Sequence, residues 1–230
     1  MIRMVVFDMA GTTVDEDNVV YKTLQLAIHD NGHDFSLDQV MAEGAGKEKF
    51  QAIRSVLKGA DIEDDLLSET IYKHFKILLQ EAYRYLDVKG QPNALELFRK
   101  LKQQNIFVIL NTGYNTETAN SLIEKLGWEK GEQYDSLITA SNVKKSRPEP
   151  DMILLAMHKF NIQHASEVIK VGDSIIDIEE GKNAKCALSI GITTGAHSYD
   201  QLLSANPDYI ISNLLELLEI IRDYNFLYAD

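Results

Sequence analysis

The chain has 230 residues, of which 45% are hydrophobic, and a formal net charge of −12 at pH 7. A chain of this length buries roughly 70–75% of its unfolded surface, which fits one large domain, or a core domain that carries a smaller insertion. The excess of acidic residues argues against nucleic acid or an anionic membrane as the main partner, because both favour basic patches. A small anionic substrate stays compatible with this charge, since a metal ion and a few cations can invert the field locally.

The sequence favours a cytoplasmic protein. Cys186 is the only cysteine, so no intrachain disulfide can form. The first residues read as a short strand and not as the apolar stretch of a signal peptide. No apolar run approaches the ~20 residues that span a bilayer, so we expect no membrane segment.

The chain opens with a strand and then becomes helical. Residues 2–7 are apolar and β-branched at their centre, which is typical of a buried parallel strand, and residues 8–13 read as a polar loop. From residue 19 to residue 85 apolar side chains recur at three-to-four spacing, with no convincing strand between them. The apolar side chains of this region are Leu24, Ile28, Ile53, Val56, Leu57, Ile71, Phe75, Leu78 and Leu79.

After a break at residues 90–93, strands and helices alternate strictly. The predicted strands are 106–110, 136–139, 168–171, 187–190 and 209–211, and the predicted helices are 116–126, 151–160, 177–184 and 214–222. This order predicts an α/β fold, a Rossmann-like open parallel sheet with helices on both faces. The helical segment interrupts the fold after its first strand. We therefore expect a core of residues 1–15 and 88–230, with residues 16–87 inserted as an all-helical cap domain.

Polar side chains follow the predicted strands where each strand ends. Asp8 follows the first strand, Thr112 the second, residues 144–147 the third and Asp173 the fourth. In open parallel sheets the ligand crevice lies beyond these carboxyl ends. Asp8 and Asp173 would repel each other there unless a hard cation lay between them, and Mg²⁺ favours carboxylate oxygen. Thr112 and Arg147 would then supply donors for phosphoryl oxygens. Taken singly, each residue is as well explained as a turn former, a helix cap or a loop residue.

Together these elements resemble the haloacid dehalogenase superfamily over essentially the whole chain. The motifs that carry the resemblance are residues 8–12, Thr112, Arg147-Pro148 and the run Gly172-Asp173-Ser174-Ile175-Ile176-Asp177. The resemblance implies that Asp8 is a nucleophile forming an aspartyl-phosphate, which water later hydrolyses. It also implies that Thr112 and Arg147 hold the phosphoryl oxygens. Asp173 and the Ala10 carbonyl would ligate Mg²⁺, with Asp177 just behind them.

Ala10 narrows the resemblance to one branch. Most phosphatases of the superfamily carry a second aspartate there, which protonates the leaving oxygen. Alanine at this place is characteristic of phosphonoacetaldehyde hydrolases (phosphonatases), in which a cap lysine forms a Schiff base and the leaving group is carbon. Lys47 in Gly44-Ala45-Gly46-Lys47 matches their Gly-x-x-Lys element. A Schiff-base lysine must be partly neutral, which burial favours.

The same resemblance places Tyr114 beside the nucleophile. It also implies that Thr12, Gly113 and Gly46 contact the substrate.

Two departures keep other functions open. Phe50 stands where the phosphonatases have a histidine, and Asn18 stands where they tend to have cysteine or serine. Lys47 is equally well explained as a solvated lysine. We therefore expect a hydrolase of a small phosphonate or phosphate metabolite, acting as a monomer or a homodimer. A phosphomonoesterase similar to phosphoglycolate phosphatases is the alternative, and a catalytically silent phosphometabolite-binding protein is a third reading.

Overall fold

The computed structural model describes residues 1–45 and 47–227 of the chain. The chain falls into two compact units, which are described separately. The core unit consists of Met1–Asp15 and Val88–Asp230, and the helical unit consists of Glu16–Asp87. The chain thus leaves the core unit soon after its first strand and rejoins it at Val88.

The core unit is built on a parallel sheet. Within the described residues this sheet has six strands, and every neighbouring pair runs parallel. The strands are, in sheet order, β5 (Ser136–Thr139), β4 (Phe107–Thr112), β1 (Met4–Asp8), β6 (Val168–Gly172), β7 (Leu188–Ile192) and β8 (Tyr209–Ile211). The first strand in the chain is central to the sheet, so both of its neighbours come from later sequence. The predicted α/β class with an open parallel sheet is confirmed.

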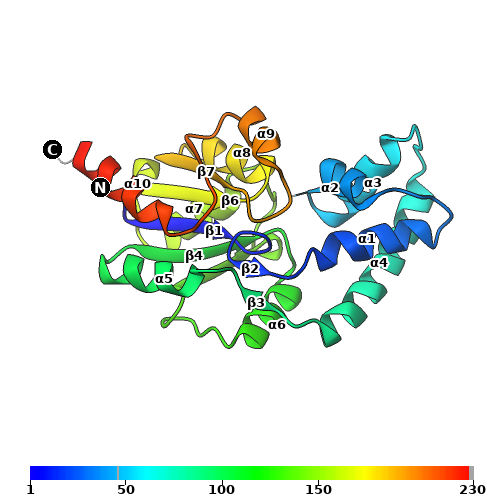
Figure 1. Ribbon diagram of the computed structural model, residues 1–230, viewed down its shortest axis with the longest axis horizontal. Helices are drawn as coiled ribbons and strands as arrows, with labels where there is room; N and C mark the ends of the chain where they lie inside the picture. The colour runs from blue at the N-terminus through cyan, green and yellow to red at the C-terminus, as the bar shows by residue number, and fades with distance from the viewer. Residues whose placement is uncertain (46, 228–230) are drawn as a thin grey trace. The chain divides into compact units, whose positions relative to one another are not determined.

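Helices cover both faces of this sheet (Figure 1). The helices of the core unit are α5 (Ala94–Gln103), α6 (Thr116–Leu126), α7 (Asp151–Lys159), α8 (Ile175–Asn183), α9 (Tyr199–Ser204) and α10 (Glu216–Leu227). Side chains alternate between the two faces along a strand. Met4 and Val6 of β1 accordingly join a buried cluster with α7, whereas the Phe7 ring contacts Phe98 of α5 at a centroid distance of 5.4 Å.

The helical unit contains α1 (Val19–His29), α2 (Leu37–Gly44), α3 (Lys49–Lys58) and α4 (Asp65–Tyr85). Its described residues form no strand, as the periodicity predicts. Side-chain caps fix where the helices begin. Ser36 and Gln39 form a capping box at α2, and Asp64 accepts a hydrogen bond from the Leu67 amide at α4. The apolar side chains at helical spacing pack inward, with Leu24 and Ile71 fully buried.

Three short elements of the core unit have no counterpart in the prediction. Val14–Asp15 (β2) and Lys89–Gly90 (β3) pair as a short antiparallel ribbon, and α9 lies between the predicted strands 187–190 and 209–211. Two-residue strands carry no usable periodicity, and α9 is only six residues long. The helix predicted to begin at residue 177 begins earlier in the structure, at Ile175 of α8, directly after Ser174.

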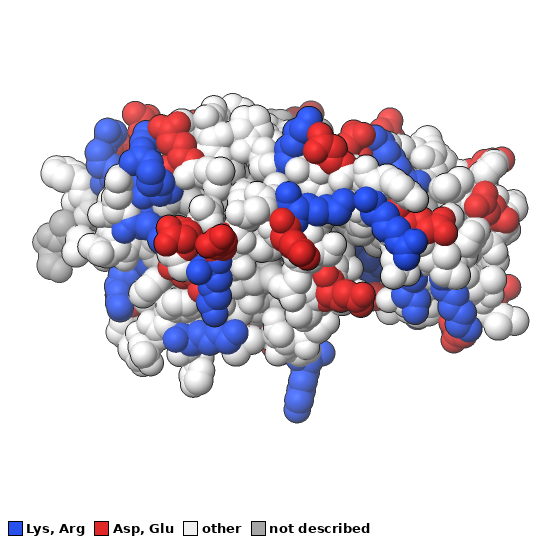
Figure 2. Space-filling model, turned by 90° about the horizontal axis from the view of Figure 1, so that it is seen from below, with Lys and Arg blue, Asp and Glu red and all other residues white. Residues whose placement is uncertain are grey.

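The surface mixes both signs of charge. On the face in Figure 2, lysine and arginine side chains are interspersed with aspartate and glutamate. Among the described residues, no helix combines the length and the apolarity that a membrane crossing requires.

We expect Phe98→Ala to lower the free energy of unfolding by about 3–5 kcal/mol, because it leaves a cavity between α5 and the sheet. The Phe98 side chain is 1% exposed and also packs edge-to-face on Trp128. Urea denaturation measures the effect. Leu95→Ala on the same helix is the control, since Leu95 is 50% exposed. A loss of equal size in both variants would contradict this packing.

Candidate active site

The carboxyl ends of the central strands bring the predicted residues to one place. Asp8 is the last residue of β1 and lies opposite Asn111 in the register of β4, one residue before Thr112. On the other side of β1, β6 ends at Gly172, so Asp173 directly follows it. This is the edge at which open parallel sheets bind ligands.

Three buried aspartates and one arginine form the centre of this site. Carboxylate oxygens of Asp8, Asp173 and Asp177 lie within 4.8 Å of one another, and these residues are 4%, 5% and 0% exposed. Arg147 lies in the loop after β5, and its Nη1 is 2.8 Å from Asp8 Oδ1. The same Nη1 donates to Asp177 Oδ1. Arg147 therefore bridges two of the acids.

Asp177 is held in its charged form by several donors. Besides Arg147, its carboxylate accepts a hydrogen bond from the Ser174 hydroxyl at 2.5 Å and lies 3.0 Å from Lys170 Nζ. Burial alone would raise the pKa of Asp177, but the Arg147 and Lys170 cations and the Ser174 hydroxyl lower it to about 2. Asp177 is thus ionised at neutral pH.

The charged forms of Asp8 and Asp173 are less well stabilised than that of Asp177. Burial raises the pKa of Asp8 to about 6 against the opposing pull of Arg147. Burial, and then the Asp8 and Asp177 carboxylates, raise the pKa of Asp173 well above its usual range. Both acids would ionise more readily with a further cation beside them.

The donor set and charge of the site fit Mg²⁺. Among the described residues of the core unit, the buried cluster contains four carboxylates and two cations, which leave a net charge of −2 when all are ionised. Mg²⁺ would neutralise this charge, and carboxylate oxygen is its preferred ligand. The members of the cluster are Asp8, Asp173, Asp177, Glu180, Arg147 and Lys170.

A loop that sequence reasoning assigned no role wraps around Asp173. The Ala196 amide donates to Asp173 Oδ2 at 2.6 Å, and the His197 amide donates to the Asp173 carbonyl at 3.2 Å. The backbone at Gly195 passes so close that any Cβ there would overlap the Asp173 carboxylate. Thr194 Oγ1 donates to the Gly11 carbonyl at 2.7 Å and so ties this loop to the segment that follows Asp8.

His197, in the same loop, is buried. Its Nδ1 accepts a hydrogen bond from the Ile175 amide at 3.0 Å, at the start of α8. Burial lowers the pKa of His197, which keeps the ring neutral at pH 7. The ring therefore fixes the beginning of the helix that carries Asp177.

The remaining predicted residues of the core unit lie around this centre. Thr12 is buried and donates to Asp173 Oδ1 at 3.5 Å, and Thr112 is buried and accepts a hydrogen bond from the Tyr114 amide at 3.2 Å. Gly113 lies between Thr112 and Tyr114 in the chain. Ala10 pairs with Val14 in an isolated bridge.

Lys47, the predicted Schiff-base lysine, belongs to the helical unit. Lys47 is half-buried, and its Nζ donates to Ser55 Oγ at 3.0 Å within that unit. Gly46 lies outside the described residues. The roles of both therefore stay predictions.

Sequence reasoning missed Lys170. This residue interrupts an apolar strand, Val168-Ile169-Lys170-Val171, and is fully buried in the structure. A lysine inside a buried strand needs an anionic partner, so the interruption itself was the available signal.

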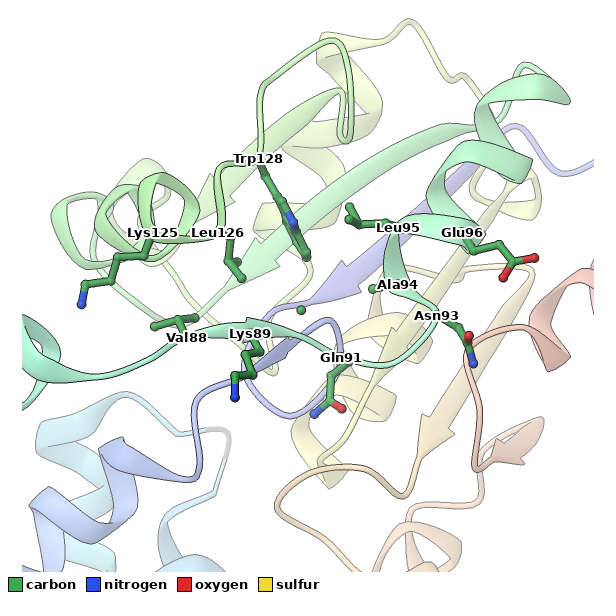
Figure 3. A pocket seen from close by; sticks show the side chains of 11 residues that line it. Val88, Lys89, Gln91, Asn93, Ala94, Leu95, Glu96, Lys125, Leu126 and Trp128 are labelled. Atoms are coloured by element: carbon green, nitrogen blue, oxygen red, sulfur yellow. The ribbon is translucent and has the colours of Figure 1, made fainter.

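A pocket of about 430 Å³ also opens on the core unit. Figure 3 shows the Trp128 ring reaching toward it, with side chains of β3 and of the first turn of α5 around it. None of the three clustered aspartates lines this pocket. Burial, charge and carboxylate geometry mark the strand ends as the candidate active site instead.

Comparison with known proteins agrees with this geometry. A family model described as haloacid dehalogenase-like hydrolase matches residues 2–185. The chain belongs to this family and is a hydrolase, as its motifs predict.

Its relatives include phosphonatases and phosphatases. A phosphonoacetaldehyde hydrolase of Latilactobacillus sakei is 26% identical over 97% of this chain and 96% of its own length. A phosphoglycolate phosphatase of Vibrio parahaemolyticus is 25% identical over 96% of both chains. The crystal structure of a phosphonoacetaldehyde hydrolase-like protein from Oleispira antarctica is 25% identical, with a TM-score of 0.82 over 97% of this chain and 92% of that one.

We expect Mg²⁺ to raise the melting temperature more at about pH 7.5 than at about pH 5. The raised pKa values mean that the folded, metal-free protein keeps protons on Asp8 and Asp173 that the unfolded chain has lost. For Asp8, the stability therefore falls by about 3 kcal/mol as pH rises from about 4 to about 6, and Asp173 adds a further loss in the same direction. Mg²⁺ restores this loss only where the carboxylates are free of protons.

Differential scanning calorimetry with EDTA or Mg²⁺ measures this difference. Asp173→Asn is the control, and it should reduce both the Mg²⁺ effect and its pH dependence. An Mg²⁺ effect of the same size at both pH values would contradict the assignment.

Proposed function

We propose that this enzyme is a Mg²⁺-dependent hydrolase of a small phosphonate or phosphate metabolite, with Asp8 as its nucleophile. The contact that carries the proposal is the buried ion pair between Asp8 and Arg147, beside the buried Asp173. A carboxylate held in this way presents an oxygen to a substrate and cannot rotate freely.

The chemistry takes two steps. An Asp8 oxygen attacks phosphorus, and a P–O bond forms as the bond from phosphorus to the leaving group breaks. Water then attacks the aspartyl-phosphate, which releases inorganic phosphate and frees Asp8. Thr112 stands at the adjacent strand end and would donate to a phosphoryl oxygen.

Arg147 would bind the same phosphoryl group. Its Nε is buried and has no acceptor among the described residues. A buried donor without a partner costs free energy, which a substrate oxygen would recover. Mg²⁺, held by Asp8, Asp173 and the Ala10 carbonyl, would neutralise charge on the phosphoryl oxygens.

The leaving group is the second part of the proposal. Ala10 cannot protonate a leaving oxygen, so we favour a carbon leaving group whose electrons pass to a Schiff base. In this scheme Lys47 condenses with the substrate carbonyl, and the electrons of the broken C–P bond form an enamine. Protonation of the enamine carbon and hydrolysis of the imine return the lysine and release the aldehyde.

Lys47 is hydrogen-bonded to a neutral group. Its Nζ donates to the Ser55 hydroxyl at 3.0 Å. Glu48 instead caps α3, where its carboxylate accepts hydrogen bonds from the Phe50 and Gln51 amides.

A phosphomonoesterase is the second candidate function, and Phe50 favours it. The Phe50 ring packs edge-to-face on Tyr72 at a centroid distance of 5.6 Å and has no group that exchanges protons. The phosphatase names among the relatives support the same candidate. A silent binding protein fits less well, because a binder has no use for a buried nucleophile.

We expect borohydride to trap a covalent adduct of the wild-type protein with phosphonoacetaldehyde, seen by intact-mass spectrometry. The reason is that borohydride reduces an imine to a stable amine. Lys47→Arg should give no adduct, while the neighbouring Lys49→Arg should give the wild-type result. Absence of an adduct, together with Mg²⁺-dependent release of phosphate from esters, would favour the phosphomonoesterase.

We expect Asp8→Asn to lower the turnover of an aryl phosphate by about 10³-fold or more, because an amide cannot serve as the nucleophile. Phosphate release in the presence of Mg²⁺ measures this loss. Asp15→Asn, at an exposed acid on the same segment, is the matched control. Normal turnover by Asp8→Asn would show that the nucleophile lies elsewhere, and absence of turnover by the wild type would favour the binding protein.

A further inference from the structure

A buried lysine lies behind the nucleophile. Lys170 is in the middle of β6 and is 0% exposed. Its Nζ is 3.0 Å from Asp177 Oδ1, 3.0 Å from Glu180 Oε2 and 3.3 Å from Asn111 Oδ1. An ammonium group without partners at this depth would be strongly destabilising, so the folded state requires these contacts.

The contacts of Lys170 cross the central strand. β4 and β6 flank β1, with Asn111 of β4 opposite Asp8 and Lys170 of β6 opposite Val6. The hydrogen bond from Lys170 to Asn111 therefore spans β1 next to its catalytic end. Asn111 Nδ2 also donates to Glu180 Oε1 at 3.0 Å, which joins both strands to α8.

Asp177 connects this network to the nucleophile. Its Oδ1 lies against both Lys170 Nζ and Arg147 Nη1, and Arg147 Nη1 contacts Asp8. Burial alone would lower the pKa of Lys170, but the Glu180 and Asp177 carboxylates raise it above its usual range. Lys170 is therefore a fixed charge and not a proton carrier.

We propose that Lys170 is a positioning residue, which fixes Asp177 so that Arg147 is aimed at Asp8 and at the phosphoryl group. This proposal rests on the proposed function of Asp8 and Arg147. The simpler alternative is that Lys170 only neutralises Glu180. The two explanations make different predictions. If Lys170 only neutralises Glu180, removing Lys170 and the Glu180 charge together should leave the activity unchanged.

The double variant Lys170→Met/Glu180→Gln distinguishes the positioning role of Lys170 from simple neutralisation of Glu180. It removes one charge of each sign, so the cluster keeps its net charge and no carboxylate loses its only cation. We expect kcat with an aryl phosphate to fall about 10- to 100-fold, as is usual when a group behind a metal site is lost. The affinity for Mg²⁺ by calorimetry and the melting temperature should stay close to those of the wild type.

A second readout does not depend on turnover. Calorimetric titration with inorganic phosphate in the presence of Mg²⁺ reports how well Arg147 is aimed, and we expect the double variant to bind phosphate more weakly by a similar factor. The single variant Glu180→Gln is the matched control. It leaves Lys170 on Asp177 and should show a much smaller loss in both measurements.

Wild-type kcat and wild-type phosphate affinity in the double variant would overturn the positioning role of Lys170. If that variant does not fold, Lys170→Gln/Glu180→Gln replaces it, because neutral amides can still hydrogen-bond to Asn111. A wild-type enzyme without turnover would overturn the proposed function, and the phosphate titration would still decide the role of Lys170.

Discussion

The ion pair between Asp8 and Arg147 lies where four carboxylates are removed from water at one edge of a sheet. Carboxylates in such surroundings repel one another and favour protonation, so each must be matched by a cation or by hydrogen-bond donors. Arg147 and Lys170 supply the fixed positive charge of this cluster. One divalent cation would balance the remaining charge of −2. The need for charge compensation thus connects the proposed metal site with Arg147 and Lys170.

The backbone also contributes to this balance. Asp173 receives an amide hydrogen bond from the loop after β7, and Gly195 permits the close approach that this bond needs. Thr194 links the same loop to the segment after Asp8. These contacts hold the loop, β1 and the end of β6 in one arrangement, which reduces the reorganisation that catalysis would require.

Much of this site follows from the order of strands in the sequence. A residue directly after a buried parallel strand must lie at the carboxyl edge, so Asp8, Thr112 and Asp173 could be brought together without a structure. The structure does bring Asp8, Asp173, Asp177 and Arg147 together, while their catalytic roles remain proposals.

What the sequence did not reveal depends on tertiary contacts. Lys170 could have been noticed as a charge inside a strand, but its partners come from β4 and α8. The packing of the loop around Asp173 has no periodic pattern, since its hydrogen bonds join residues far apart in the chain. For the same reason the sequence does not reveal that His197 is buried and accepts a hydrogen bond from the Ile175 amide at the start of α8.

The central place of β1 also affects how the protein is made. Both partners of this strand, β4 and β6, are synthesised after the whole helical unit, and β6 begins only at Val168. The contacts within Glu16–Asp87 are local in sequence, so that unit can fold on the ribosome while β1 still lacks its neighbours. The apolar strand Met4–Asp8 therefore lacks its β4 neighbour until about half of the chain has been synthesised, and it lacks its β6 neighbour for longer. During that interval its unpaired backbone edge is open to wrong pairing with other chains.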